Sequence, residues 1–173
     1  MIEEIISWLK AIVIALLIVV VVRGVLMTPS IVKGDSMDPN LQDGDRIIIS
    51  KIHDIDRFDE IAFIAPDKDE NYVKRVIGLP GDHIKIEDDV LYINNTPYVE
   101  VYLDDKKEGY GSDQLFTGNY SLDGVVPEDS FFVLGDNRPI SRDSRSFGVI
   151  DASSVIGEVV FRIWPLENIG IIN

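Results

Sequence analysis

The sequence predicts a mainly β protein, in which a compact, barrel-like β domain follows a single N-terminal transmembrane helix. One observation is an apolar segment from Ile5 to Met27, which includes the unbroken run AIVIALLIVVVV at 11–22. A second is that no helical period is sustained after residue 27. Short apolar runs recur there between Gly, Pro, Asp and Asn turn signals, a spacing typical of barrels and sandwiches.

The N-terminal segment is long enough to cross a bilayer. As a helix, residues 5–27 would measure about 35 Å, and a hydrocarbon core is about 30 Å thick. A buried core helix and a cleavable signal peptide are the alternatives. The segment has no polar face, the chain begins with MIEE, and no A-x-A-like site follows. We therefore interpret residues 1–27 as an uncleaved signal-anchor that contacts membrane lipid through residues 5–27, although the flanking charges do not fix its orientation.

Residues 28–173 form the predicted β domain. Its expected strands are the apolar runs Arg46–Ser50, Glu60–Ala65, Tyr72–Ile77, His83–Ile86, Val90–Ile93, Phe131–Leu134 and Val155–Ile163. The polar stretch 104–124 lies within a region at about 88–130 and is expected to form a flap or a mobile loop. Residues Ile163–Ile172 are unusually apolar for a C-terminus. With Val25–Met27 they form either a surface that touches the bilayer or a final core strand.

The composition excludes several classes of function. The chain has 30 acidic and 16 basic residues, a net charge of -14 and a pI of about 4.4. The anchor segment holds two charges of each sign, so the whole net charge falls on the β domain. Such a domain repels phosphate, and we expect no nucleic-acid partner. The absence of cysteine and the presence of only two histidines argue against disulfides, thiolate chemistry and histidine metal sites, so we expect no metal and no cofactor.

None of the serines lies in the nucleophile-elbow motif of the α/β-hydrolases. The G-x-S-x-G pattern is absent, because the chain reads GDSMD around Ser36. A Ser-His-Asp triad would need His53 or His83. Both lie in polar strings, which favour solvated histidines.

Three longer strings stand out from this background. They are 31–41 (IVKGDSMDPNL), which Gly44 and Asp45 follow, 72–82 (YVKRVIGLPGD) and 135–148 (GDNRPISRDSRSFG). Each string alone is compatible with turns and surface charge. In this order, behind an N-terminal anchor, they closely resemble the motifs of type I signal peptidases, the membrane-bound serine proteases that cut signal peptides from exported preproteins. The resemblance covers the anchor and most of 28–164, but not the region at about 88–130.

The resemblance implies a Ser/Lys dyad. In that family S-M-x-P carries the nucleophile and K-R-x-x-G-x-P-G-D carries a lysine general base, which here are Ser36 and Lys74. By the same resemblance, Ser141 holds the lysine by a hydrogen bond. The resemblance also implies that Asp143 and Arg145 form a structural pair behind the site.

Specificity is also implied by the resemblance. The family cuts after small residues, typically alanine, at the first and third positions before the cut. The walls of the shallow pockets would be Val32, Met37, Leu41, Ile47, Tyr72 and Val73. Ordinary core is the alternative for these residues, above all for Leu41 and Ile47. Gly34 stands in the oxyanion region, where some members have a serine that donates to the oxyanion, so a second donor here would have to be a backbone N–H.

The chemistry requires a lysine that is neutral at the working pH. The pKa of a free lysine is about 10.4, and burial lowers it. On a strand Lys74 shares a face with Tyr72 and Val76, so an inward Lys74 would be desolvated, whereas Arg75 on the opposite face is expected to stay in water. Pro39 excludes a helix directly after the nucleophile, which would therefore lie on a turn.

These observations predict a serine endopeptidase that removes signal peptides and is anchored once in the plasma membrane. By the resemblance, the catalytic domain lies on the extracytoplasmic side. A self-cleaving repressor protease has a similar Ser/Lys site, but it should carry a DNA-binding domain where this chain has an anchor. A membrane-anchored, inactive binding or assembly module of the same fold is the other alternative. The presence of both Ser36 and Lys74 argues against it, and a cleavage assay separates the two.

Overall fold

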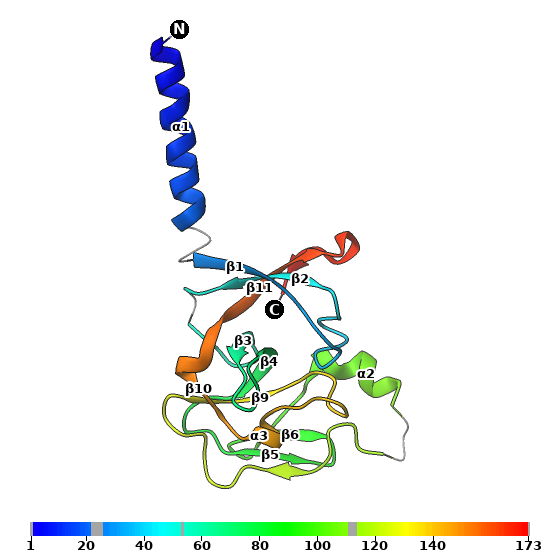
Figure 1. The fold of residues 1–173 in the computed structure, drawn as a ribbon. Coiled ribbons are helices and arrows are strands. Elements are labelled where there is room, and N and C mark those ends of the chain that lie inside the picture. Colours follow the sequence, from blue (N-terminus) through cyan, green and yellow to red (C-terminus); the bar gives the residue numbers. More distant parts are fainter. Residues whose placement is uncertain (1, 22–25, 53, 111–113, 173) are drawn as a thin grey trace.

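The structure, a computed structural model, describes residues 2–21, 26–52, 54–110 and 114–172. Figure 1 shows one long helix, α1 (Ile2–Val21), that stands away from a β domain. The expected transmembrane segment at 5–27 overlaps α1, but its residues 22–25 lie outside the described ranges. Within those ranges, no helix has both the length and the apolar character needed to cross a membrane. Met27, which we expect to end the anchor, is instead the first residue of a strand.

The described strands of the β domain form two antiparallel sheets. The larger sheet has the order β1-β2-β11-β3-β4-β9-β10, with β12 beside β11, and the smaller has the order β7-β6-β5-β8. The larger sheet contains β1 (Met27–Ile31), β2 (Arg46–Ser50), β3 (Glu60–Ile64), β4 (Asn71–Gly78), β9 (Ser130–Leu134), β10 (Ile150–Asp151), β11 (Val155–Trp164) and β12 (Gly170–Ile171). The smaller contains β5 (Ile84–Glu87), β6 (Val90–Ile93), β7 (Thr96–Tyr98) and β8 (Tyr120–Ser121). The mainly β prediction is confirmed, and the larger sheet curls into a half-barrel.

The apolar runs of the sequence locate the long strands well. Those at 46–50 and 90–93 coincide with β2 and β6, and the other expected runs overlap β3, β4, β5, β9 and β11. The sequence does not predict β1, β7, β8 and β10, and it offers β12 only within the alternative of a final core strand at 163–172. β1 contains a proline, and the other strands have only two or three residues, so none gives a clear apolar pattern. These short strands depend on pairing with a longer neighbour, as Ile150 and Asp151 pair with Phe131 and Ser130.

The core consists of three clusters of buried apolar side chains. One joins the two sheets through residues such as Ile77, Ile84 and Phe132. A second packs Ile61 and Phe63 of β3 against neighbouring strands. The third joins the loop between β1 and β2 to the larger sheet and consists of Val32, Met37, Leu41, Ile47, Ile49, Ala62 and Val159.

Short helical segments occur in the connections. They are η2 (Val101–Leu103), α2 (Asp104–Glu108), α3 (Ser144–Phe147), η3 (Ala152–Ser154) and η4 (Leu166–Asn168). The polar stretch expected at 104–124 begins as α2, and its later part enters β8. It is anchored to the domain at its beginning and near its middle, because Leu103, Phe116 and Thr117 are buried.

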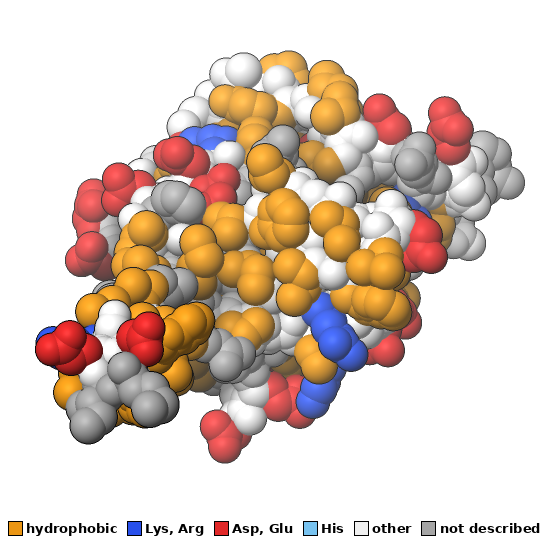
Figure 2. Space-filling view, turned by 90° about the horizontal axis from the view of Figure 1, so that it is seen from above, with side chains coloured by type: hydrophobic (Ala, Val, Ile, Leu, Met, Phe, Trp, Pro, Cys, Tyr) orange, Lys and Arg blue, Asp and Glu red, His pale blue; other side chains and the backbone are white. Residues whose placement is uncertain are grey.

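The C-terminal residues combine the two interpretations given above. β12 pairs with β11, and Ile172 packs against the third core cluster. Other large apolar side chains near them are exposed, namely Met27, Ile31, Ile163, Trp164, Leu166, Ile169 and Ile171. We call these the apolar end surface. It lies at the end of the domain nearest to α1, and Figure 2 shows hydrophobic side chains gathered on that face. Val25 lies outside the described residues.

Candidate active site

Ser36 and Lys74 meet at the centre of the site. Ser36 lies in a turn between β1 and β2, and Lys74 lies in the middle of β4. The Lys74 Nζ donates a hydrogen bond of 2.7 Å to Ser36 Oγ and one of 2.8 Å to the carbonyl oxygen of Val73. Lys74 is only 3% exposed, and Ser36 is half-buried. A serine hydroxyl in contact with a sheltered amine is the arrangement that Ser/Lys chemistry needs.

Burial changes the acidity of this amine. Desolvation lowers the pKa of Lys74 from 10.5 to about 8, although Asp143 and Asp136 act in the opposite direction. The Nζ also lies 5.3 Å from the centre of the Tyr72 ring. Because the neutral amine becomes the main form above about pH 8, Lys74 can accept a proton under mildly basic conditions.

The turn that carries Ser36 is held by the loop after β9. The backbone N–H of Asn137 donates to the carbonyl oxygen of Ser36 at 3.0 Å. Its side-chain amide donates to the carbonyl oxygen of Asp35, also at 3.0 Å. Gly34 adopts φ +78°, and its N–H donates to Asp43 at 2.7 Å. A positive φ strains residues with a side chain but not glycine, so a glycine at position 34 favours the tight turn before Ser36.

Ser141 lies close to the turn but does not make the expected hydrogen bond to Lys74. Its Oγ is buried and has no hydrogen-bond partner among the described residues. Gly135 lies between them. A Cβ on Gly135 would come within 2.1 Å of Ser141 Oγ and 2.5 Å of the Ser36 carbonyl oxygen. The close approach of these two segments therefore requires a glycine at 135.

Asp143 and Arg145 form a bidentate ion pair. The Arg145 Nε donates to one carboxylate oxygen at 2.9 Å, and Nη2 donates to the other at 2.8 Å. Asp143 also caps α3 and accepts a hydrogen bond of 3.1 Å from the N–H of Gly135. Arg145 in turn donates to the carbonyl oxygens of Thr117 and Arg138. The pair thus holds the loop that contacts the Ser36 turn.

The prediction that Arg75 stays in water is wrong. Arg75 is 2% exposed, because its face of β4 is covered by other parts of the domain. Its guanidinium donates to the two oxygens of Asp136 at 3.0 and 2.7 Å, and to Glu60 at 2.6 Å. The Tyr102 ring lies 4.2 Å from it. Two carboxylates and an aromatic face replace the water that the guanidinium loses.

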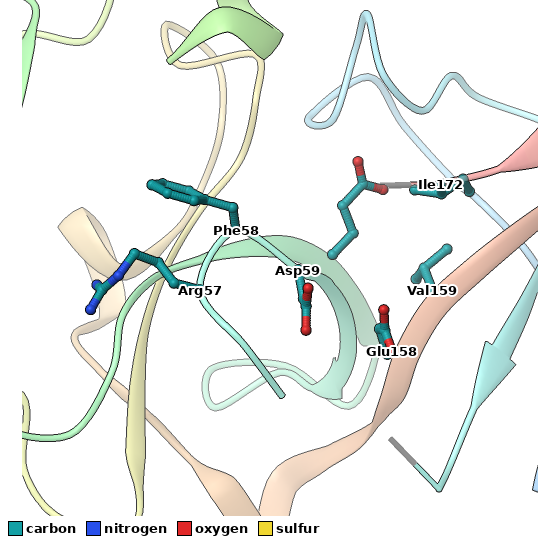
Figure 3. Close-up of a pocket in the computed structure, with 7 residues that line it drawn as sticks. Arg57, Phe58, Asp59, Glu158, Val159 and Ile172 are labelled. Atoms are coloured by element: carbon teal, nitrogen blue, oxygen red, sulfur yellow. The ribbon is translucent and has the colours of Figure 1, made fainter. Parts of the chain in front are cut away.

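Glu60 joins this network to a cavity of about 230 Å³. The cavity is lined by Arg57, Phe58, Asp59, Glu60, Glu158, Val159 and Ile172. Figure 3 shows Arg57 and Phe58 on one side of it, and Val159 and Ile172 on the other. Burial raises the pKa of Glu60 to about 7, because the attraction of Arg75 offsets only part of the desolvation. Neither Ser36 nor Lys74 lines this cavity, so it is distinct from the dyad.

The expected substrate pockets are only partly accessible. Met37, Leu41 and Ile47 are at most 1% exposed and offer almost no surface to a ligand, because the curled sheet packs around them. Val32 is buried in the same cluster. Val73 and Tyr72 are half-buried. For Leu41 and Ile47, the structure favours the core alternative.

Sequence reasoning missed several polar residues that support the site. Asn40, Asp136 and Asn137 link the Ser36 turn to the loop after β9, and Glu100 pairs with Arg138 at 2.5 Å in the interior. The GDNR string is the signal for them in the sequence, but the string alone does not assign individual roles to its Asp, Asn and Arg. Among the described residues, no group of three or more acidic or histidine side chains is arranged to hold a metal. His53 is not described, and His83 lies beside β5 in contact with Asn94.

Comparison with known proteins places the chain in one family. The signal peptidase family, peptidase S26, matches residues 5–164. Signal peptidase IB of Staphylococcus aureus (strain COL) is 37% identical over 178 residues, which cover 95% of this chain and 92% of the relative. Signal peptidase I of Bacillus licheniformis is 40% identical over 169 residues, which cover 94% of this chain and 90% of the relative.

A solved structure agrees with these sequence matches. The crystal structure of a signal peptidase I from Enterococcus faecalis V583 superposes with a TM-score of 0.62 and 40% sequence identity. It covers 63% of this chain and 99% of the solved chain. The protein therefore belongs to the signal peptidase family, peptidase S26, and is a serine endopeptidase of the signal peptidase I type.

Proposed function

We propose that this protein removes signal peptides from exported preproteins, with Ser36 as the nucleophile and Lys74 as the general base. The contact of 2.7 Å between Lys74 Nζ and Ser36 Oγ carries the proposal, because the lysine is buried and its pKa is about 8. Family membership supports the substrate class.

The reaction follows from these two side chains. The neutral amine of Lys74 takes the proton of Ser36 as Oγ attacks the scissile carbonyl, and it then protonates the departing amine of the mature protein. Water, activated by the same lysine, releases the signal peptide from the acyl-enzyme. The backbone N–H of Ser36 is the natural donor to the oxyanion. Gly34 lies in the same turn and has no side chain that could act as a second donor.

The other predicted residues take supporting roles. The Asp143–Arg145 pair fixes the loop beside the Ser36 turn. Ser141, whose buried hydroxyl has no hydrogen-bond partner among the described residues, lies against Gly135 beside the Ser36 turn. Tyr72 and Val73 are the candidates for contact with the small residues before the cut, since they keep accessible surface near Lys74.

The location we propose is the plasma membrane, with residues 1–27 as a single anchor and the catalytic domain 28–173 on the extracytoplasmic side. The exposed apolar side chains of α1 support the anchor, because water disfavours such a surface. The apolar end surface, on the side of the domain toward α1, suits contact with lipid. Such a position would place Ser36 close to a membrane-inserted signal peptide.

The decisive experiment is cleavage of an A-x-A signal-peptide substrate by the detergent-solubilised full chain. The wild type should cut after the second alanine, whereas Ser36→Ala and Lys74→Ala should be inactive. Ser146→Ala and Lys33→Ala are matched controls, because both side chains are exposed and lie near the site in sequence. If the wild type did not cut, or if the two site variants cut equally well, the dyad would be wrong. The anchored binding module would then be the better account.

The anchor needs a separate test. The full chain should remain with phospholipid vesicles after high-salt and alkaline washes, because its attachment is apolar. Leu17→Arg, in the middle of the apolar run of α1, should release a measurable part of the protein. Complete release of the wild type by alkaline washing would contradict a membrane-spanning anchor.

A further inference from the structure

Asn40, four residues after the nucleophile, contacts three separate parts of the domain. Its side-chain amide donates to Asp136 at 2.8 Å and to the carbonyl oxygen of Tyr102 at 3.0 Å. Its own carbonyl oxygen accepts a hydrogen bond from Nη2 of Arg162 in β11. We propose that Asn40 is a positioning residue that fixes the Ser36 turn against Lys74. This inference rests on the proposed role of Ser36 as nucleophile.

The geometry of the turn connects Asn40 to Ser36. The N–H of Leu41 donates to the carbonyl oxygen of Met37 at 2.9 Å, so the segment 37–41 forms one closed turn. Asn137 holds the two residues directly before this segment, because it donates to the carbonyl oxygens of Asp35 and Ser36. Asp136, the neighbour of Asn137, holds its end through Asn40. The loop after β9 thus contacts the chain on both sides of Ser36.

The same loop is tied to the strand that carries the base. Asp136 accepts two hydrogen bonds from Arg75, and Arg75 directly follows Lys74 in β4. A continuous path therefore runs from Asn40 through Asp136 and Arg75 to the backbone of Lys74. The relative position of Ser36 Oγ and Lys74 Nζ depends on this path, because the two residues lie on elements that do not pair in the sheet.

The middle region of the chain supplies the outer partner of Asn40. Tyr102 is part of η2, and its ring covers the Arg75 guanidinium. Its hydroxyl donates to Glu100 at 2.6 Å, and Glu100 pairs with Arg138 in the interior. The contacts of the Tyr102 side chain with Arg75 and Glu100 therefore fix the residue whose carbonyl oxygen Asn40 contacts. This gives a structural role to residues 100–102, within the region at about 88–130 that carries no recognisable motif.

Loss of the Asn40 amide should lower kcat more than it changes KM. The turn would keep its backbone contacts through Asn137, so the substrate could still bind. The hydroxyl of Ser36 would no longer be held in the geometry needed for proton transfer, and a misplacement of about 1 Å can cost on the order of a hundredfold in rate. The pH at half-maximal rate should not move, because the burial of Lys74 is unchanged.

The test compares Asn40→Ala, Asn40→Asp and Gln42→Ala in the full chain. Asn40→Asp keeps the size of the side chain but faces the carboxylate of Asp136 with a second one. Gln42 is the matched control, because it directly follows the turn and its side chain, among the described residues, makes a single exposed contact of 3.3 Å, with Asp38. Cleavage kinetics, the pH profile, the unfolding temperature and titration of reactive Ser36 with a serine-directed acylating reagent are measured for each.

We expect kcat of Asn40→Ala to fall by about tenfold to a hundredfold, with KM within about twofold of wild type and an unchanged pH midpoint. Asn40→Asp should be slower still, and Gln42→Ala should match the wild type. A kcat within twofold of wild type for Asn40→Ala, beside an inactive Ser36→Ala, would overturn this inference alone. A loss of rate that only follows the loss of folded protein, or a shifted pH midpoint, would also overturn it. An inactive wild type would overturn the proposed function and this inference with it.

Discussion

The Nζ of Lys74 lies 2.7 Å from the Oγ of Ser36, although the two residues are 38 positions apart in the chain. Lys74 is held by the regular ladder of β4, and Ser36 is held on a turn by side chains of another loop. The base is thus placed by backbone pairing and the nucleophile by polar contacts. Different kinds of substitution should therefore disturb each of them.

The rate should depend on pH through Lys74. Its pKa of about 8 lies below the ordinary value of 10.5, and only the neutral form can accept the proton of Ser36. We expect kcat/KM to rise with pH, reach half its maximum near pH 8 and then level off. A midpoint near 10.5, or no dependence on pH, would contradict the assignment. The unfolding temperature at each pH serves as the control for loss of folded protein.

Removal of the charge of Lys74 should change stability in a pH-dependent way. The pKa of this amine is lower in the folded protein than in the unfolded chain, so the unfolded chain binds more protons between about pH 8 and 10.5. The wild type should therefore gain stability as the pH rises through this range. Lys74→Met should lack this gain and be more stable than wild type below pH 8, by up to about 3 kcal/mol.

Urea unfolding at several pH values measures this difference. Lys33→Met is the matched control, since Lys33 is exposed and its loss should leave the pH dependence unchanged. If Lys74→Met were less stable than wild type at pH 7, the amine would be stabilised in its charged form. The argument for a neutral base would then fail.

Glu60 should affect stability in a lower pH range. Burial raises its pKa to about 7 from 4.5, so the folded protein binds more protons than the unfolded chain between these values. The stability that comes from the protonated form is complete below pH 4.5 and is lost as the pH rises through 7. Glu60→Gln should remove this decline, as followed by urea unfolding between pH 4.5 and 8. Glu87→Gln, at an exposed position, should retain it.

A methyl group at 135 should disrupt the site more than the fold. It would meet Ser141 Oγ at 2.1 Å and the Ser36 carbonyl oxygen at 2.5 Å, distances that force the loop and the turn apart. We expect Gly135→Ala to lose on the order of a hundredfold in kcat/KM. Gly170→Ala is the control, because a Cβ there meets nothing within 4 Å. Equal activity of the two variants would show that the turn can shift without loss.

The sequence predicts the parts of this site that depend on local patterns. The apolar runs locate the long strands, and alternation along β4 predicts that Lys74 shares a face with Tyr72. The resemblance of three strings to a known family supplied Ser36 and Lys74 as a pair, and the structure brings them into contact.

The sequence could not predict contacts between distant polar residues. Alternation assigns Arg75 to the other face of β4, which predicts a solvated side chain, but it does not reveal what covers that face. Asn40 and Asp136 are 96 residues apart, and nothing in either local string indicates that they meet. The hydrogen bond expected from Ser141 to Lys74 is not made in this structure, because the position of the Ser141 hydroxyl depends on loop packing around Gly135 that no sequence pattern fixes.

The polar stretch after Leu103 has a practical consequence for protein engineering. Directly before this stretch, Leu103 is buried and the carbonyl oxygen of Tyr102 accepts a hydrogen bond from Asn40 in the Ser36 turn. Farther along the chain, Glu108 and Gly109 are exposed. An epitope tag or a fluorescent label grafted after Gly109 should therefore be tolerated. The same graft between Glu100 and Leu103 should abolish activity. The region without a recognisable motif thus contains a position that should accept an insertion and, a few residues away, a segment that should not.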